Sequence, residues 1–303
     1  MVTENVITIN NLTKSFKGFQ LNVPHLEIPK GFATALIGEN GAGKTTLLNI
    51  LAGIRLDYKG QITCMGKNIV NGTENAKVKE KIGYTGPGNY YLPHWNIKQV
   101  EELTELLFDD FNKDRFRQIC MELAIFPDGN FTGSKKVKEL SDGTKMKLML
   151  AGMLARNTDL LIMDEPASPL DPVMREKLCD TIRSYIDSGA GEKSVFFSTH
   201  NVSDMEYVTD YAIIMEHGQV VEAGFVEDLK EKYILVKGDK EAEKAARPYL
   251  YSVSSNSFGF EGICLAENLN TLAGLNLSTE RPSLFQISVA VMKANSKVMM
   301  NKR

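Results

Sequence analysis

The chain has 303 residues, 43% of them hydrophobic and 24% charged, with a formal net charge of −3. These proportions are those of ordinary globular proteins, and they exclude a disordered or fibrous chain. A slightly acidic protein has no general attraction to phosphate backbones, so we do not expect nucleic acid as a partner. The length suits one large α/β domain with a smaller appendage, or two modest domains.

The first predicted elements are strands. Three short apolar runs, at residues 33–37, 160–163 and 195–197, do not alternate with polar residues, and polar residues or glycine follow each of them at once. This pattern is typical of strands buried on both faces of a parallel sheet. Helical patterns follow two of the runs, at residues 44–52 and 173–186. The alternation predicts a doubly wound α/β domain, in which ligands bind at the carboxyl ends of the strands.

Two further regions differ from this core. Between residues 89 and 157 helical patterns dominate, at 98–107, 113–123 and 145–156, and we interpret the stretch as a helical insert. We predict that residues 1–224 form the main domain and residues 225–303 a small appended α+β domain. The appended domain would hold a short helix at 227–233, an apolar segment at 234–236, a polar stretch at 252–257 and a last helix at about 282–294.

The cysteines and the apolar segments carry two further expectations. Cys64, Cys120, Cys179 and Cys264 show neither zinc-site spacing nor a disulfide framework, so we expect reduced and mostly buried thiols. The N-terminus lacks the pattern of a secretion signal. No stretch reaches the roughly 18 apolar residues that a membrane helix needs. If the chain works at a membrane, we expect another polypeptide to supply the span.

The strongest motif is a complete P-loop pattern, G-x-x-x-x-G-K-[ST], placed between a predicted strand and a predicted helix. Its glycines let backbone N–H groups surround a polyphosphate, and the N-terminus of the helix adds partial positive charge. Lys44 would reach the β- and γ-phosphates, and the Thr45 hydroxyl would be a Mg²⁺ ligand. The alternative is a glycine-rich turn with a chance lysine. The predicted nucleotide-binding residues here are Gly38, Glu39, Asn40, Gly41, Ala42, Gly43, Lys44, Thr45 and Thr46.

A second candidate site follows the apolar run at residues 160–163. Asp164 ends a buried strand, where an unpartnered carboxylate would be costly, and a Mg²⁺ ion shared with Thr45 removes that cost. Glu165 is expected to polarise an attacking water molecule. Taken alone, an apolar run before Asp-Glu is as often an ordinary strand end. The P-loop upstream supports the catalytic interpretation.

Between these sites, residues 140–145 (Leu-Ser-Asp-Gly-Thr-Lys) resemble the signature motif of ATP-binding cassette ATPases. Residues 168–171 (Ser-Pro-Leu-Asp) are similar to the D-loop of that family, and His200 is similar to its switch histidine. Phe16 falls where the family places an aromatic ring that stacks on adenine. The resemblance covers residues 3–224 in the family's order and spacing.

The resemblance implies an ATPase that works as a head-to-tail pair, a homodimer or a heterodimer, closing on two ATP molecules. Ser141 and Gly143 of one copy would contact the ATP held by the P-loop of the other, and His200 would contact the γ-phosphate. Asp171 of the D-loop is also expected to be a nucleotide-binding residue. It also implies a separately encoded transmembrane permease as partner and a cytoplasmic place on the inner face of the cell membrane. Each residue has a plainer alternative: a strand-end histidine, a core aromatic for Phe16, and helix caps for the signature residues.

The chain departs from the family in two places. The loop at residues 85–89 lacks the Gln that the family uses to sense Mg²⁺, for which Asn89 is a possible substitute, and Asp142 and Thr144 alter the signature. An extra carboxylate near a γ-phosphate repels it unless the carboxylate points away, so hydrolysis is expected to be slow. Aromatic residues at 90–95 suit either an interface anchor for the membrane subunit or a packed core.

The C-terminal residues 280–285 resemble the tail of the bacitracin-exporter-like subgroup. The leading hypothesis is therefore an ATP-hydrolysing subunit of an exporter, with ATP and Mg²⁺ as cofactors. Two alternatives stay open. One is a non-transport cassette ATPase acting on ribosomes or DNA, and the other is a regulatory cassette with weak activity, suggested by the missing Gln.

Overall fold

A computed structural model describes residues 4–69, 75–86, 91–126, 131 and 133–300. Its centre is a six-stranded sheet in the order β10-β9-β3-β8-β7-β6, in which only β10 is antiparallel to its neighbour. The three strands predicted from apolar runs lie side by side in it as β3, β8 and β7. The strands of this sheet are β3 (Ala33–Ile37), β6 (Ile82–Thr85), β7 (Leu160–Asp164), β8 (Ser194–Thr199), β9 (Tyr211–Glu216) and β10 (Gln219–Phe225).

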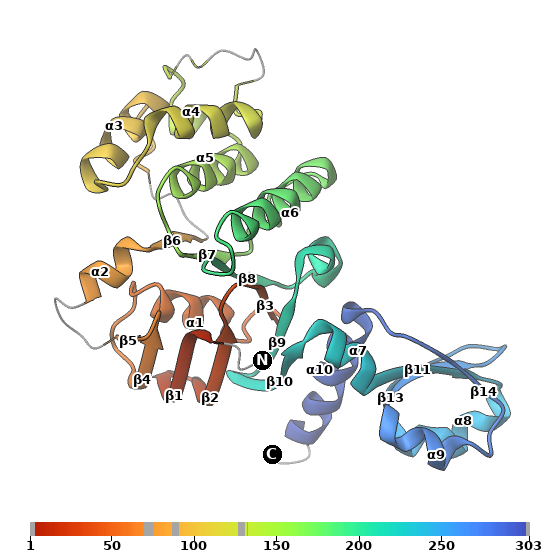
Figure 1. Cartoon of the computed structure of the whole chain (residues 1–303). Helices are drawn as coiled ribbons and strands as arrows, with labels where there is room; N and C mark the ends of the chain where they lie inside the picture. Colours follow the sequence, from red (N-terminus) through yellow and green to blue (C-terminus); the bar gives the residue numbers. More distant parts are fainter. Residues whose placement is uncertain (1–3, 70–74, 87–90, 127–130, 132, 301–303) are drawn as a thin grey trace.

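The central sheet is buried on both faces, as the apolar runs predict. Along β7, Leu161 and Met163 join the core on one face, while Leu160 and Ile162 join the core on the other. Helices α5 (Asp142–Leu154) and α6 (Pro172–Asp187) pack on the first face. Helix α1 (Lys44–Leu51) packs on the second, and Figure 1 shows it between the central sheet and a second sheet. Successive side chains of a strand point to opposite faces, so a run with no polar residue fills both cores.

The second sheet was not predicted from the sequence. It is antiparallel, in the order β2-β1-β4-β5, and its apolar face closes the core over α1. The strands are β1 (Asn5–Phe16), β2 (Phe19–Pro29), β4 (Lys59–Cys64) and β5 (Lys67–Asn68), and α2 (Asn75–Glu80) follows them.

The predicted helical stretch contains α3 (Ile97–Leu107), α4 (Lys113–Glu122), the short 3₁₀ helix η1 (Val137–Glu139) and α5. Asn96, Asn112 and Ser141 cap the three α-helices by accepting backbone N–H groups of the first turn. The cap at Ser141 explains why α5 begins three positions before the predicted residue 145. In Figure 1 these helices lie on the opposite side of the central sheet from β1, β2 and β4.

The C-terminal part forms a four-stranded antiparallel sheet in the order β12-β13-β11-β14. The polar stretch at 252–257 was not predicted as a strand, yet most of it lies in β12, an edge strand that needs little burial. The elements are β11 (Tyr233–Gly238), α8 (Lys240–Ala246), η4 (Arg247–Tyr249), β12 (Leu250–Ser255), β13 (Phe260–Leu265), η5 (Ala266–Asn268), α9 (Leu269–Leu272) and β14 (Leu277–Glu280).

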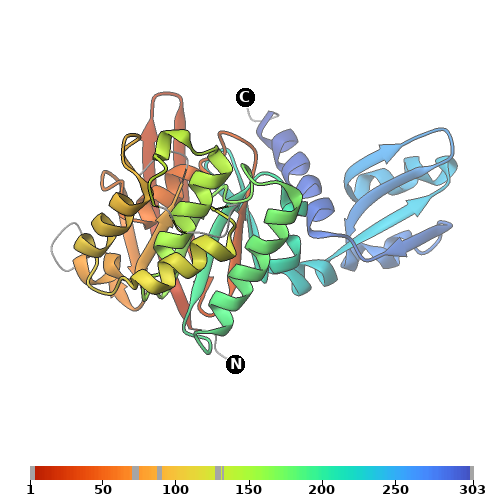
Figure 2. The same ribbon diagram turned by 90° about the horizontal axis from the view of Figure 1, so that it is seen from above.

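Two helices join this sheet to the rest of the molecule. Helix α7 (Val226–Lys232) directly precedes the first strand of this sheet, β11, and α10 (Leu284–Met300) follows its last strand, β14. Leu284, Ile287 and Val291 of α10 are buried in the same cluster as the helices of the central sheet. Figure 2 shows α10 between the main body and the C-terminal sheet, which extends to one side. In the part of the chain that is described, no helix is long and apolar enough to span a membrane.

The start of α10 and the segment just before it are held to the main body by polar contacts. The Leu284 N–H donates to Glu206 Oε1 at 2.9 Å, and Arg281 pairs with Glu227 of α7 at 2.7 Å. Glu206 opens η3 (Glu206–Val208), which follows η2 (Val202–Asp204). The segment at 280–285, which resembles the tail of the subgroup, therefore has a structural role: it holds the last helix against the main body.

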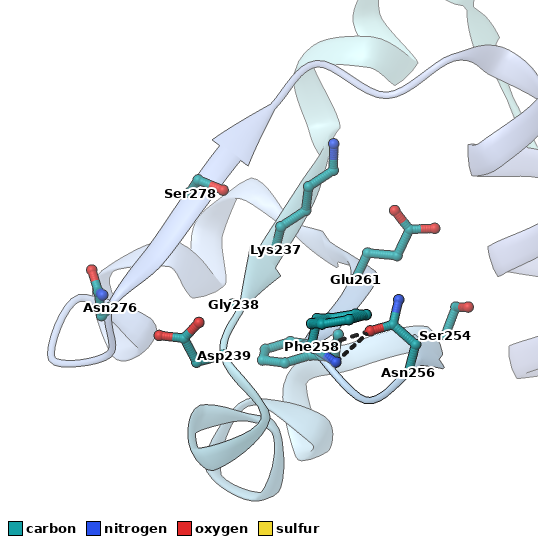
Figure 3. Close-up of a pocket in the computed structure, with 11 residues that line it drawn as sticks. Lys237, Gly238, Asp239, Ser254, Asn256, Phe258, Glu261, Asn276 and Ser278 are labelled. Carbon is teal, nitrogen blue, oxygen red and sulfur yellow. Dashed lines mark hydrogen bonds between the residues drawn. The ribbon is translucent and has the colours of Figure 1, made fainter.

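The C-terminal sheet carries an open, polar hollow of about 580 Å³. Figure 3 shows the Phe258 ring at its rim, with the Asn256 Oδ1 accepting the N–H groups of Phe258 and Gly259. Lys237 faces the same hollow, and Glu280 pairs with its ammonium group at 2.7 Å. No predicted site residue lines it.

All four cysteines are buried free thiols. Burial raises the pKa of Cys64 and of Cys120 to about 12 and that of Cys179 to about 11. They are therefore protonated at neutral pH and pack as small apolar side chains.

Candidate active site

The predicted P-loop joins the end of β3 to the start of α1, and its glycines are structurally required. Gly41 and Gly43 have φ angles of 87° and 105°, in the left-handed region where glycine is favoured. A Cβ atom at Gly38 would lie 2.4 Å from the Met215 carbonyl oxygen, so the backbone there approaches β9 more closely than any side chain allows. The loop geometry explains why three glycines stand where they do.

The Lys44 side chain turns back into this loop and is only 6% exposed. Its Nζ donates to the carbonyl oxygens of Gly38 at 2.7 Å and Glu39 at 3.3 Å, and it lies 3.4 Å from Glu165 Oε1. A positive charge is thus held beside the N-terminus of α1. This combination suits a bound polyphosphate.

An open cavity of about 330 Å³ lies over the loop. It brings together most of the predicted nucleotide-binding residues with one residue that was not predicted, Phe19. Phe19 opens β2, and its ring lies 6.1 Å from that of Phe16 between centroids. The sequence signal that could have indicated Phe19 is a second aromatic residue three positions after Phe16. The described lining residues are Phe16, Phe19, Glu39, Asn40, Gly41, Gly43, Lys44, Thr45, Thr46 and Glu165.

Phe16 lies at the edge of the cavity, with 39% of its surface exposed. Lys14 Nζ and Arg55 Cζ lie 5.1 and 5.2 Å from its ring centroid. An exposed ring flanked by cations can stack on a nucleobase. Stacking on adenine at Phe16 stays a prediction.

Asp164 ends β7 and is 1% exposed. Its Oδ1 accepts a hydrogen bond from the Ser198 hydroxyl, whereas its Oδ2 is buried and has no hydrogen-bond partner among the described residues. A buried carboxylate oxygen without a partner is costly, and a divalent cation would remove that cost. Thr45 offers a hydroxyl at the start of α1, which packs against β7. The donor set of one carboxylate and one hydroxyl fits Mg²⁺.

Glu165, the next residue, connects three parts of the site. It has a φ of 52°, which is uncommon for a residue with a side chain. Its Oε2 lies 2.7 Å from His200 Nδ1, and its Oε1 faces Lys44. The ends of β7 and β8 and the P-loop therefore converge at the carboxyl edge of the sheet, as the strand pattern predicts. A partly exposed carboxylate beside a histidine can accept a proton from water.

The predicted signature and D-loop residues lie elsewhere in the chain. The Ser141 Oγ accepts the Thr144 N–H at 3.2 Å, and the Asp171 Oδ1 accepts the Met174 N–H at 3.1 Å, so both cap helices. A Cβ at Gly143 would lie 2.7 Å from the Pro169 carbonyl oxygen, so the two segments pack together. None of the three lines the cavity in the described part of the chain. Within one chain, Ser141 and Asp171 therefore act as helix caps and Gly143 allows close packing.

The altered signature is compensated locally. The Asp142 carboxylate pairs with Lys145 one turn along α5, at 2.9 Å, and its side chain is 85% exposed. Its charge is therefore partly neutralised and well hydrated. The repulsion expected from an extra carboxylate is correspondingly small.

The loop after β6 is described only in part. Thr85 is buried and its hydroxyl contacts the sulfur atoms of Met146 and Met149, while Asn89, the possible substitute for the missing Gln, and Tyr90 lie outside the described residues. Further on, Tyr91 and Trp95 pack against the core, and Leu92 is 56% exposed. Burial raises the pKa of Tyr91 to about 12. The two described aromatic residues of this segment, Tyr91 and Trp95, thus belong mainly to the core.

Comparisons with known proteins agree with this geometry. Residues 21–168 match the family model described as ABC transporter. The tungstate uptake system ATP-binding protein TupC of Peptoclostridium acidaminophilum is 31% identical over 218 residues, covering 72% of this chain and 97% of TupC. The energy-coupling factor transporter ATP-binding protein EcfA1 of Mycoplasmopsis synoviae is 28% identical over 273 residues, covering 87% of this chain and 98% of EcfA1.

Solved structures show the same fold. The dimeric structure of a bacterial ABC transporter cassette has a TM-score of 0.62 at 20% identity, covering 72% of this chain and 98% of that one. A bacterial Atm1-family ABC exporter with ATP bound has a TM-score of 0.62 at 21% identity, covering 76% of this chain and 40% of that one. The predicted P-loop NTPase fold is confirmed.

Proposed function

The chain belongs to the ABC transporter family of ATP-binding proteins, and from that premise we propose that this ATPase drives a separately encoded membrane permease. The supporting observation is the convergence of Lys44, Asp164, Glu165 and His200 at one edge of the central sheet. These residues come from three segments that only the fold brings together. We also propose the domain limits: residues 1–224 form the nucleotide-binding domain, in which about 89–157 are the helical insert, and residues 225–303 form the small C-terminal domain.

The proposed roles follow from the contacts. Backbone N–H groups of the P-loop and the Lys44 ammonium group bind the β- and γ-phosphates of ATP. Asp164 Oδ2 and the Thr45 hydroxyl hold a Mg²⁺ ion, which would neutralise charge on the phosphate oxygens. Glu165 orients a water molecule and accepts its proton, while His200 keeps the Glu165 carboxylate in place and donates to the γ-phosphate.

The second half of the site is proposed to come from another copy or a related chain. Ser141 and Asp142 are exposed at the start of α5, on a helix end that is free for a further contact. The Ser141 hydroxyl and the Gly143 N–H are donors suited to a γ-phosphate. The fold shared with a dimeric cassette supports this arrangement. The present contacts suit a homodimer and a heterodimer equally.

The direction of transport is a finer proposal. Export, in the manner of the bacitracin-exporter-like subgroup, rests on the segment at residues 280–285 alone, whereas the named relatives include a tungstate uptake protein. The proposed location is the inner face of the cell membrane, bound to the permease. Substrate movement in inverted vesicles that carry both subunits would decide the direction.

The proposed function is tested by purification from detergent-solubilised membranes. The tagged chain is expected to bring down a membrane protein and to hydrolyse Mg-ATP faster with it than alone. Glu165→Gln serves as the matched control, because it should bring down the same partner without hydrolysis. Hydrolysis that never responds to any membrane protein would contradict the proposal. A turnover already negligible and unchanged by Glu165→Gln would favour the regulatory alternative.

A further inference from the structure

Ser198 is a buried hydroxyl residue that no motif singled out for a role of its own. It lies in β8 after an apolar run and is fully buried. In the parallel register it stands directly beside Asp164 of β7. A buried hydroxyl in such a strand requires hydrogen-bond partners, and here both partners belong to the catalytic pair.

The hydroxyl makes two bonds. It donates to Asp164 Oδ1, and it accepts the Glu165 backbone N–H at 2.9 Å. One atom thus contacts the expected metal ligand and the expected general base at the same time. A buried serine without such a role could instead donate its hydroxyl hydrogen to a nearby backbone carbonyl oxygen.

We propose that Ser198 is a positioning residue, which holds Asp164 and Glu165 in the orientation that hydrolysis needs. This inference rests on the proposed ATPase function. The Asp164 carboxylate can rotate about χ2, whose preferences are broad. Because Ser198 engages Oδ1, Oδ2 is left as the single oxygen presented to Mg²⁺.

The second bond acts on Glu165. Its left-handed backbone is rarely adopted by residues with a side chain and needs support from its surroundings. The Ser198 hydroxyl oxygen supports this backbone by accepting the Glu165 N–H. In this conformation the Glu165 Oε2 contacts His200. Loss of the hydroxyl should therefore disturb both carboxylates, although neither is altered itself.

The test compares Ser198→Ala with Ser194→Ala. Ser194 is also buried in β8 and also accepts a backbone N–H, from Gly31 at 2.9 Å, but it lies at the other end of the strand. Both variants lose one buried hydroxyl, so their melting temperatures should fall by similar amounts. Calorimetry would measure the affinity for ATP with and without Mg²⁺, and steady-state assays would measure kcat and KM.

For Ser198→Ala we expect the gain in ATP affinity on adding Mg²⁺ to fall about tenfold and kcat to fall about 10- to 100-fold. The affinity of Ser198→Ala for ATP without Mg²⁺ should change less than about twofold. Ser194→Ala should match the wild type in its gain in affinity on adding Mg²⁺, in kcat and in its affinity without Mg²⁺. Ser198→Thr keeps the hydroxyl and should restore the response to Mg²⁺. An Ala variant with wild-type metal response and kcat, or one losing affinity equally with and without Mg²⁺, would overturn the inference. A wild type that binds Mg-ATP but never hydrolyses it would instead count against the proposed function, and the binding comparison would still test Ser198.

Discussion

The two halves of the expected nucleotide site differ in how far a single chain completes them. On the P-loop side, Glu165 contacts both Lys44 and His200, and Asp164 keeps a buried oxygen without a hydrogen-bond partner among the described residues. On the signature side, the Ser141 hydroxyl bonds only within its own helix turn as far as the structure describes it, and the helix start is exposed. The first half presents groups suited to a phosphate and a cation, whereas the second half is an exposed surface that we propose contacts the ATP bound by another copy.

The largest effect is expected for Glu165→Gln on the P-loop side. The amide keeps a similar size but cannot accept a proton, so kcat should fall about 10²- to 10⁴-fold. The affinity for Mg-ATP should change little, because the binding groups remain. A phosphate-release assay and calorimetry check the two parts. A variant that retained most of its turnover would show that Glu165 is not the general base.

Lys44→Ala is expected to act on binding itself. Removing the ammonium group loses charge-assisted hydrogen bonds to the phosphates and should weaken ATP affinity about 10- to 100-fold. It also leaves the Glu165 carboxylate without its cationic neighbour. Fluorescence titration with a labelled nucleotide measures the change, and Lys67→Ala is the control, because Lys67 is an exposed lysine of β5 that does not line the cavity. Equal affinity in Lys44→Ala and the wild type would contradict the binding role.

On the signature side, Ser141→Ala should leave ATP binding to the isolated chain within about twofold, while kcat falls about tenfold. The reason is that the hydroxyl is proposed to reach the ATP of another copy. Loss of the cap also lowers stability by about 1 kcal/mol, which thermal unfolding would register. The variant Ser141→Asn, which preserves a cap, separates the two effects. Weakened ATP binding in the monomeric protein would place the signature in the same site as its own P-loop.

The smallest effect is expected for Asp142→Asn. Its carboxylate is 85% exposed and paired with Lys145, so its repulsion of a phosphate is partly neutralised and screened by water. The rate should rise less than about threefold, and stability should change by less than about 0.5 kcal/mol. A large rise in turnover would show that the departure from the family pattern is a brake on hydrolysis.

Local patterns could be predicted from the sequence, and distant pairings could not. The P-loop is recognisable because glycines, lysine and the following helix are adjacent in the chain, and the buried strand before Asp164 is marked by its apolar run. The N-terminal sheet depends on pairing of β1 with β4 across the P-loop, which no local signal reports. The Ser198 bridge depends on the register of β7 and β8, and Phe19 joins the cavity only through the turn between β1 and β2. Strand β12 was missed because its polar residues lie at a sheet edge.

The difference between the two halves is tested most directly by mixing Lys44→Ala and Ser141→Ala proteins. If each site takes its P-loop from one chain and its signature from another, half of the dimers in an equal mixture are mixed, and each has one intact site of two. We predict that the mixture recovers about a quarter of the wild-type rate, well above either variant alone. A mixture no more active than the average of the separate variants would contradict the account.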